Sequence, residues 1–254
     1  MAYIWKGFFQ ILGFAGLMGI FLANAPSSSF SQENVSNHAV VELFTSQGCS
    51  SCPPADEFLG QLAKRKNVTA LTLPVDYWDY LGWKDTLASR QFTNRQRTYA
   101  RLRGDANVYT PQMVINGVTH KVGSRYSRVN SAIQTAQSEF KKHAVPMSLK
   151  LQDNTIWVGA GDAAEGSTLK DGTVWIACVK KAVTVNIGRG ENHGRKITYY
   201  NVVRQLAPVG QWMGKAVNLR LPKQPFINDK PDFFVALLQA KDNGRIIGVA
   251  QVSN

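Results

Sequence analysis

A chain of 254 residues is long enough for one large domain or two small ones, each with a buried core. With 44% hydrophobic and 18% charged residues, the composition excludes an intrinsically disordered chain. The net charge of +12 favours weak attraction to anionic surfaces, including peripheral membrane association. The basic residues are scattered and no nucleic-acid-binding motif accompanies them, so no nucleic-acid partner is expected.

The first 25 residues have the features of an export signal. Lys6 precedes an uncharged, mostly apolar stretch, residues 7–23, and Ala23-Asn24-Ala25 is typical of a cleavage site. Pro26 disfavours cleavage at that bond, so residues 1–25 are either a signal peptide or a retained N-terminal membrane anchor. Both alternatives predict an exported protein, periplasmic or extracellular, in which disulfides persist. The polar residues 26–37 are expected to form a linker.

Residues 38–144 alternate between strand and helix patterns. A β-rich run ends in the turn Ser46-Gln47-Gly48, and Asn116-Gly117 joins two short strands as a hairpin. The predicted order is β-α-β-α-β-β-α, an α/β domain. Its elements are the strand Ala39–Thr45, the helix Ser50–Arg65, the strand Val68–Val75, the helix Thr86–Arg103, the strands Pro111–Asn116 and Val118–Val122, and the helix Ser127–His143.

Residues 145–254 have a different pattern of short β-rich runs separated by Gly, Asp, Asn and Pro. Seven strands and one helical turn near Asn201–Leu206 predict a mostly antiparallel β-sandwich as a second domain. The strands are Met147–Leu151, Thr155–Val158, Thr173–Val179, Val183–Ile187, Val217–Leu221, Phe233–Gln239 and Arg245–Val252.

Cys49 and Cys52 form a CxxC pair at a predicted helix start. Unpaired N–H groups and the positive end of the helix dipole stabilise a thiolate there, and the thiolate is the nucleophile in disulfide exchange. We therefore expect Cys49 to be exposed and to attack, and Cys52 to be more buried and to resolve the mixed disulfide. The third cysteine, Cys178, lies in a strand and is expected to be a buried core residue.

The pair is also compatible with three other kinds of site. A CxxC is also half of a zinc site, but no second ligand pair accompanies it, so neither a metal nor a cofactor is expected. A Cu(I)-handling module and a binding protein with a static Cys49–Cys52 disulfide remain open as alternatives.

The strand, the turn, the CxxC, the helix and the downstream Thr110-Pro111 together resemble the thioredoxin superfamily. The resemblance implies a thioredoxin-like domain, a cis bond before Pro111 beside the cysteines, and Thr110 as a substrate contact. Tyr109 and Trp78 are further candidate substrate contacts, although covering the inter-domain seam or the core is the favoured explanation of the aromatic residues around Trp78. In this family a buried carboxylate assists the resolving thiol, and Glu42 is the acid on the first strand. Glu42 is thus either the proton acceptor or a strand-edge residue facing solvent.

Four stretches are similar to DUF1223, a family of uncharacterised exported bacterial proteins. They are VVELFTSQGCSSCPPAD (40–56), VDYWDYLGWKD (75–85), VYTPQMVINGV (108–118) and RGENHGRKITYYNVVR (189–204). Within the last, residues 189–195 are expected to form a tight loop that docks on the first domain. The chain is expected to be an exported thiol–disulfide oxidoreductase, with protein or small-molecule thiols and disulfides, and a redox partner protein, as partners. The direction of electron flow stays open.

Overall fold

A computed structural model describes residues 37–163, 165–169 and 171–254, and all of them belong to one compact unit. The predicted signal or anchor and nearly all of the predicted linker lie outside the described residues. Within them, no helix is both long and apolar enough to cross a membrane.

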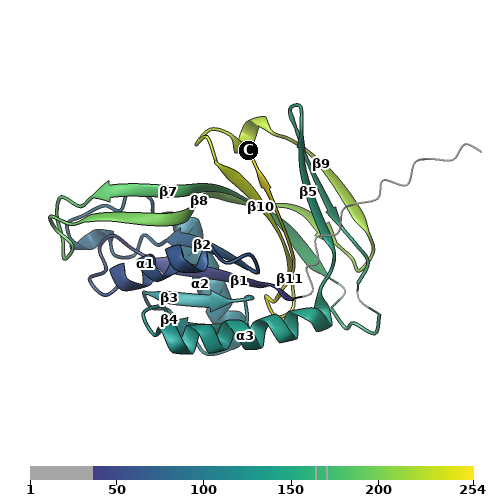
Figure 1. The fold of residues 1–254 in the computed structure, drawn as a ribbon, viewed down its shortest axis with the longest axis horizontal. Coiled ribbons are helices and arrows are strands. Elements are labelled where there is room, and N and C mark those ends of the chain that lie inside the picture. The colour runs from purple at the N-terminus through teal and green to yellow at the C-terminus, as the bar shows by residue number, and fades with distance from the viewer. Residues whose placement is uncertain (1–36, 164, 170) are drawn as a thin grey trace, which may run out of the picture. The chain divides into compact units, whose positions relative to one another are not determined.

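An eight-stranded mixed sheet runs through both halves of the chain (Figure 1), in the order β11-β10-β7-β8-β2-β1-β3-β4. From residue 39 to 143 the elements follow the β-α-β-α-β-β-α order expected from the sequence. They are β1 (Ala39–Thr45), α1 (Pro53–Leu62), β2 (Val68–Pro74), a short 3-10 helix (Asp79–Leu81), α2 (Arg90–Arg103), β3 (Gln112–Ile115), β4 (Thr119–Val122) and α3 (Tyr126–His143).

The second half contributes four more strands to that sheet and a separate three-stranded sheet, β5-β6-β9. Apolar side chains of the small sheet pack against β7, β10 and β11, so the two sheets face each other as in a sandwich. The elements are β5 (Met147–Gln152), β6 (Thr155–Ala160), β7 (Gly172–Asn186), β8 (Lys196–Trp212), β9 (Val217–Pro222), β10 (Phe233–Ala240) and β11 (Ile246–Ser253).

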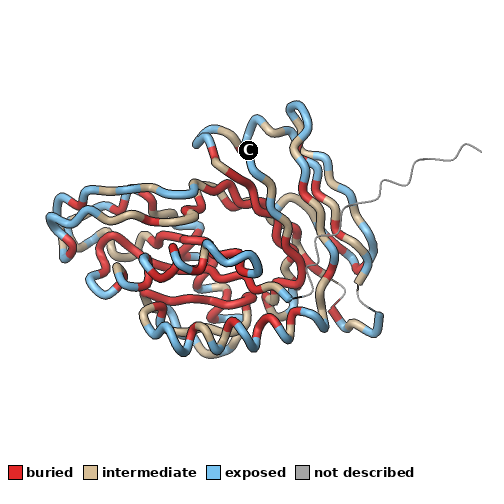
Figure 2. Tube along the Cα trace, viewed as in Figure 1, coloured by how far each residue is buried: buried red, intermediate tan, exposed pale blue. Residues whose placement is uncertain are grey.

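Helices cover both faces of the β1–β3 region. Alternate residues of β1 face opposite sides, because side chains alternate along a strand. Val41 and Leu43 pack with α1 and α3 in one apolar cluster. Val40 and Phe44 pack in another, which also holds α2 residues and side chains from β7, β8 and β10. Figure 2 shows the resulting run of buried residues along the central strands.

Two details of the second half differ from the sequence prediction. Thr173–Val179 and Val183–Ile187 are parts of one strand, β7, and the helical turn predicted near Asn201–Leu206 is instead the middle of β8. Polar residues make β8 look unlike a strand in the sequence. β8 can hold them because only one of its edges pairs throughout, with β7, while the other pairs with β2 only at Thr72–Val202. The β2–β8 junction joins the predicted domains into one sheet.

Helix α1 also contacts the second half directly. A Cβ added at Gly60 would lie 2.5 Å from the ring of Tyr200 on β8, so only glycine permits this approach. The helix that follows the cysteine pair is therefore packed against a strand that begins more than 130 residues later in the chain.

Candidate functional site

Cys49 and Cys52 are joined by a disulfide, with 5.4 Å between their Cα atoms. They lie between the end of β1 and the start of α1. Both are buried, at 1% and 0% exposure, so the prediction that Cys49 is exposed is wrong. Cys178 is a free, buried cysteine, as predicted, and burial raises the pKa of its thiol to about 12. A thiol protonated to that degree is a poor nucleophile at neutral pH.

The turn before Cys49 is fixed by a buried aspartate. Asp85 accepts a hydrogen bond from the Gln47 N–H at 2.8 Å and another from the Leu87 N–H at 2.8 Å. The turn itself closes through Cys49 N–H to Ser46 O at 3.1 Å. Burial raises the pKa of the Asp85 carboxyl, and the hydrogen bonds from Gln47 and Leu87 lower it in part. Asp85 thereby connects the cysteine turn to the loop that follows the 3-10 helix.

Helix α1 begins at Pro53 rather than at Ser50. Pro53 and Pro54 occupy its first two positions, where a missing N–H is tolerated, and Cys52 is the N-cap. The N–H groups of Ala55 and Asp56 both donate to Cys52 O, at 2.8 and 3.1 Å. The helix start therefore offers the sulfurs fewer free donors than a start without prolines. The Ser51 hydroxyl lies 3.5 Å from Cys49 Sγ and can donate to a thiolate there.

A buried carboxyl lies one helical turn after Cys52. Asp56 is fully buried, and neither of its oxygens has a hydrogen-bond partner among the described residues. Burial raises the pKa of Asp56 well above its usual range; the nearby Thr45 hydroxyl lowers it in part and the charge of Asp85 raises it further. The Tyr199 hydroxyl of β8 is also buried, and no described residue forms a hydrogen bond with it. Burial raises the pKa of Tyr199 most, and the charges of Asp56 and Asp85 raise it further.

The site residues predicted from the sequence do not include Asp56. The signal for it was present, because Asp56 lies among apolar residues of the α1 stripe that faces the core. An acid on the buried face of a helix, four residues after the second cysteine, is costly unless it is paired or protonated.

The structure does not bring Glu42 to the cysteines. Its carboxylate accepts from Arg95 Nε at 2.6 Å and from the Tyr99 hydroxyl, and Arg95 also donates to Gln239 at 3.1 Å. Glu42 lies on the face of β1 that packs on α2, opposite to α1. The strand position that faces α1 near the pair is Thr45, because side chains alternate along β1. Glu42 is thus a buried ion-pair residue, neither facing solvent nor beside Cys52.

Trp78 and the proline loop do lie beside the cysteine turn. The Trp78 indole N–H donates to Thr110 Oγ1 at 2.8 Å, and Trp78 Cβ lies 3.1 Å from the position of a Cβ on Gly48. The Thr110–Pro111 bond is cis, as the sequence predicts. Gly123 donates its N–H to Pro111 O at 2.9 Å and leaves no room for a side chain against α1.

Tyr109 has a different set of contacts. Its hydroxyl lies 2.8 Å from His120 Nδ1, and the other ring nitrogen of His120 lies 3.1 Å from Asp105. The Tyr109 carbonyl accepts from the Gln96 side chain at 2.8 Å. These contacts hold the chain entering Thr110 against β4 and α2, so Tyr109 positions the proline loop.

Residues 187–195, at the tip of the β7–β8 hairpin, cover the cysteine turn, and we call them the covering loop (Figure 1). The Asn192 amide donates to Gln47 O at 2.9 Å and to Cys49 O at 3.0 Å, and Asn192 is 1% exposed. Glu191 accepts from the Ser50 N–H at 3.3 Å. The sequence predicts a docked loop here, but not that it docks on the cysteines.

Trp83 fills the space beneath the covering loop. Its ring would lie 3.0 Å from a Cβ at Gly188, and its indole N–H donates to Gln47 Oε1 at 2.8 Å. Gly190, with φ +76°, turns the chain over Trp83 in a conformation that favours glycine. Trp78 and Trp83, which both follow β2, thus both lie against the cysteine turn.

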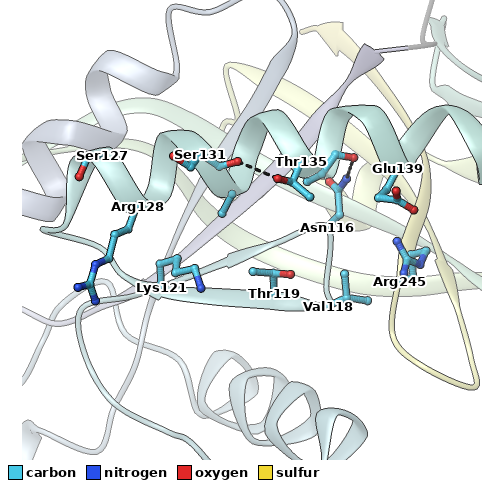
Figure 3. A pocket seen from close by; sticks show the side chains of 12 residues that line it. Asn116, Val118, Thr119, Lys121, Ser127, Arg128, Ser131, Thr135, Glu139 and Arg245 are labelled. Atoms are coloured by element: carbon cyan, nitrogen blue, oxygen red, sulfur yellow. Dashed lines mark hydrogen bonds between the residues drawn. The ribbon is translucent and has the colours of Figure 1, made fainter.

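A separate groove lies between α3 and β4, with a volume of about 700 Å³ (Figure 3). Arg128 and Lys121 lie towards one end of it and Glu139 and Arg245 towards the other. None of the site residues predicted from the sequence lines it. Over the described ranges there is also no group of three or more His, Cys, Asp or Glu side chains placed to hold a metal ion.

Comparison with known proteins places these features in a family. The model of a family described as "Protein of unknown function (DUF1223)" matches residues 40–239. The crystal structure of protein AGR_C_4864 from Agrobacterium tumefaciens is 34% identical, with a TM-score of 0.74 over 88% of this chain and 96% of that one. HBP35 of Porphyromonas gingivalis shares the fold at 11% identity, with a TM-score of 0.57 over 85% of this chain and 75% of that one. No curated protein matches.

Proposed function

The chain belongs to the DUF1223 family, and from that premise we propose that it is an exported thiol–disulfide oxidoreductase acting through Cys49 and Cys52. The observation that carries the proposal is the Cys49–Cys52 disulfide, with Trp78 against Gly48 just before it and the buried carboxyl of Asp56 four residues after it. A disulfide that served only as a cross-link has no need of a costly unpartnered acid one turn away.

We propose that residues 39–143 are a thioredoxin-like unit. The β-α-β-α-β-β-α order, the CxxC before α1 and the cis bond before Pro111 support this assignment. In such a unit the residue before the cis proline offers backbone groups to an extended substrate. Thr110 is then the substrate contact, and Trp78 holds the Thr110 side chain in place through its indole N–H.

In the reducing half of the cycle, an external thiolate attacks Cys49 Sγ. A mixed disulfide forms, the bond between Cys49 and Cys52 breaks, and Cys52 leaves as a thiolate. The protonated carboxyl of Asp56, whose pKa burial raises, supplies the proton to Cys52. A second external thiolate attacks the external sulfur, releases the oxidised external disulfide and leaves Cys49 reduced. Two electrons pass to the protein.

The reverse half transfers the same two electrons to a substrate disulfide. The Cys49 thiolate, which the Ser51 hydroxyl stabilises, attacks one substrate sulfur and releases the other as a thiolate. Cys52 gives its proton to ionised Asp56, attacks Cys49 Sγ and releases the second substrate thiolate. The compartment and the partner set the net direction.

A static cross-link is the second candidate function. The burial of both sulfur-bearing residues favours it, together with the two hydrogen bonds from Asn192 over the turn. On this alternative the disulfide holds the β1–α1 turn in shape for binding another molecule, and it is not exchanged under native conditions.

Trapping distinguishes the two. In a Cys178→Ser background, Cys52→Ser and Cys49→Ser are reduced, desalted and mixed with glutathione disulfide, and adducts are counted by intact mass. We expect Cys52→Ser to form the adduct at least tenfold faster than Cys49→Ser, since Cys49 is the attacking thiol in the proposed cycle and the Ser51 hydroxyl can stabilise its thiolate. If neither variant forms an adduct and native protein keeps its disulfide in a glutathione buffer, the static cross-link is correct.

A further inference from the structure

The covering loop places a carboxylate beside the cysteine that is expected to attack. Glu191 accepts the Ser50 N–H at 3.3 Å, and Ser50 follows Cys49 directly in the chain. Glu191 is exposed and its neighbour Asn192 is buried, so the backbone at this point of the loop is held in place while the carboxylate faces solvent.

We propose that Glu191 is a positioning residue that makes the Cys49 thiolate less stable and so keeps the pair in its disulfide form. The inference rests on the proposed function, since it concerns the regulation of the same site. The inference goes beyond the proposed function because it assigns this regulation to a residue of the covering loop, about 140 residues from the cysteines in sequence.

The first argument concerns hydrogen-bond donors. A thiolate at a helix start is stabilised by free backbone N–H groups. Pro53 and Pro54 have none, and the next two N–H groups donate to Cys52 O. Ser50 N–H belongs to the residue directly after Cys49, and Glu191 accepts its hydrogen bond. When Cys49 becomes a thiolate, it must share or lose that donor.

The second argument concerns charge. When Cys49 is a thiolate, its charge lies one residue from the Ser50 N–H that the Glu191 carboxylate contacts, and like charges that lie close together repel each other. The same loop carries Arg189 and Arg195, which act in the opposite sense, and both are exposed. Replacing Glu191 alone leaves these cations in place, so their effect cancels when the variants are compared.

The simpler explanation is that Glu191 only docks the loop. Two replacements separate the explanations. Glu191→Gln keeps an oxygen that can accept from Ser50 N–H but removes the charge, whereas Glu191→Ala removes both. Glu57→Gln is the matched control, because Glu57 is an exposed acid on α1. It removes the same charge without a contact to the cysteine turn.

The experiment measures the pKa of Cys49 as the sole thiol. In the Cys52→Ser, Cys178→Ser background, the rate of alkylation by iodoacetamide is followed from pH 5 to pH 10. Glu191→Gln is expected to lower the midpoint and to raise the rate at pH 7 about threefold, a difference that shrinks in 1 M KCl. Glu57→Gln is expected to match the parent.

An unchanged midpoint in Glu191→Gln overturns the proposal, and so does a shift found only in Glu191→Ala, which assigns the effect to docking. With both cysteines present, the equilibrium constant with glutathione is expected to shift about threefold towards the dithiol in Glu191→Gln. Failure of the proposed function is recognised separately, because a native disulfide that does not exchange with glutathione leaves the alkylation midpoints measurable.

Discussion

At the scale of single residues, two buried acids have opposite surroundings. Glu42 is paired with Arg95 and Tyr99, so its charge is balanced inside the core. Asp56 has no hydrogen-bond partner among the described side chains, and burial raises its pKa. Proteins rarely keep an unpaired buried acid without a use, because it reduces stability at neutral pH. The difference assigns Glu42 to the fold and Asp56 to the proposed chemistry.

Asp56→Asn is expected to increase stability and to slow exchange. The folded pKa of Asp56 is raised, so the folded state holds the proton while the unfolded chain releases it. The resulting loss of stability begins as pH rises above the unfolded value of 3.8 and is absent well below it. The gain from Asn should therefore be present in urea unfolding at pH 8 and vanish near pH 3. Exchange with glutathione should slow about tenfold or more. Faster or unchanged exchange would contradict the role of Asp56.

Glu42→Gln is expected to lower stability and to leave exchange nearly unchanged. Removing one partner of a buried ion pair leaves Arg95 uncompensated and costs about 3–5 kcal/mol of unfolding free energy. Exchange per folded molecule should stay within twofold of the parent, because Glu42 lies on the other face of β1 from α1. Urea unfolding and glutathione exchange on the same samples check both statements, with Glu57→Gln as the control. A Glu42→Gln variant that is stable but does not exchange with glutathione would show that Glu42 takes part in the exchange reaction.

At the scale of elements, the site is built where the β7–β8 hairpin meets the β1–α1 turn. Asn192 is the central contact, since its amide satisfies two carbonyls of that turn. For an external thiol to reach Cys49, this contact has to loosen, because Cys49 is almost fully covered. Local opening of this kind occurs without global unfolding.

Asn192→Ala is expected to open the covering loop. The two carbonyls lose a buried donor, which costs about 1–3 kcal/mol of unfolding free energy. Reduction of the disulfide by dithiothreitol under native conditions should become at least about fivefold faster, because the open form is more populated. His193→Ala, an exposed neighbour on the same loop, is the matched control. An equal reduction rate in Asn192→Ala and the parent would show that the loop does not limit access.

Local patterns predicted the elements of the first half well, and failed where distant contacts decide. The strands of residues 39–45 and 68–74 and the Asn116-Gly117 hairpin follow from β-rich runs and turn residues. The start of α1 at Pro53 could also be predicted from the sequence, since two adjacent prolines are tolerated only in the first turn of a helix. The burial of Cys49 could not be predicted, because Asn192, which contacts it, lies far along the chain.

At the scale of the whole described unit, the eight-stranded sheet continues across the point near residue 145 where the sequence pattern changes. β2 and β8 meet at Thr72–Val202, where the Thr72 hydroxyl donates to Tyr200 O at 2.6 Å and Asn201 donates to Ala70 O at 2.9 Å. One apolar cluster holds residues of β1, α2, β7, β8 and β10 together. Composition marks a change near residue 145, but it carries no information about which strands will pair across it.

The fragment comprising residues 37–144 is therefore expected not to fold alone. It lacks the β7, β8 and β10 side chains that complete the core around Phe44 and Phe92. Residues 37–254 should unfold in a single transition with the same midpoint by circular dichroism and by tryptophan fluorescence. The fragment should show no cooperative transition in urea. A cooperative fragment, or two separate midpoints in the longer chain, would show that the halves are independent domains.

The position of the covering loop in the chain has a consequence for biosynthesis. A chain that emerges from its amino end presents Cys49 and Cys52 long before residues 187–195 have been made. Until the β7–β8 hairpin forms, neither Asn192 nor Glu191 is available to the two thiols. The nascent protein thus passes through a period in which the covering loop does not shield the two thiols, and after the hairpin forms an external thiol reaches Cys49 only when the Asn192 contact loosens.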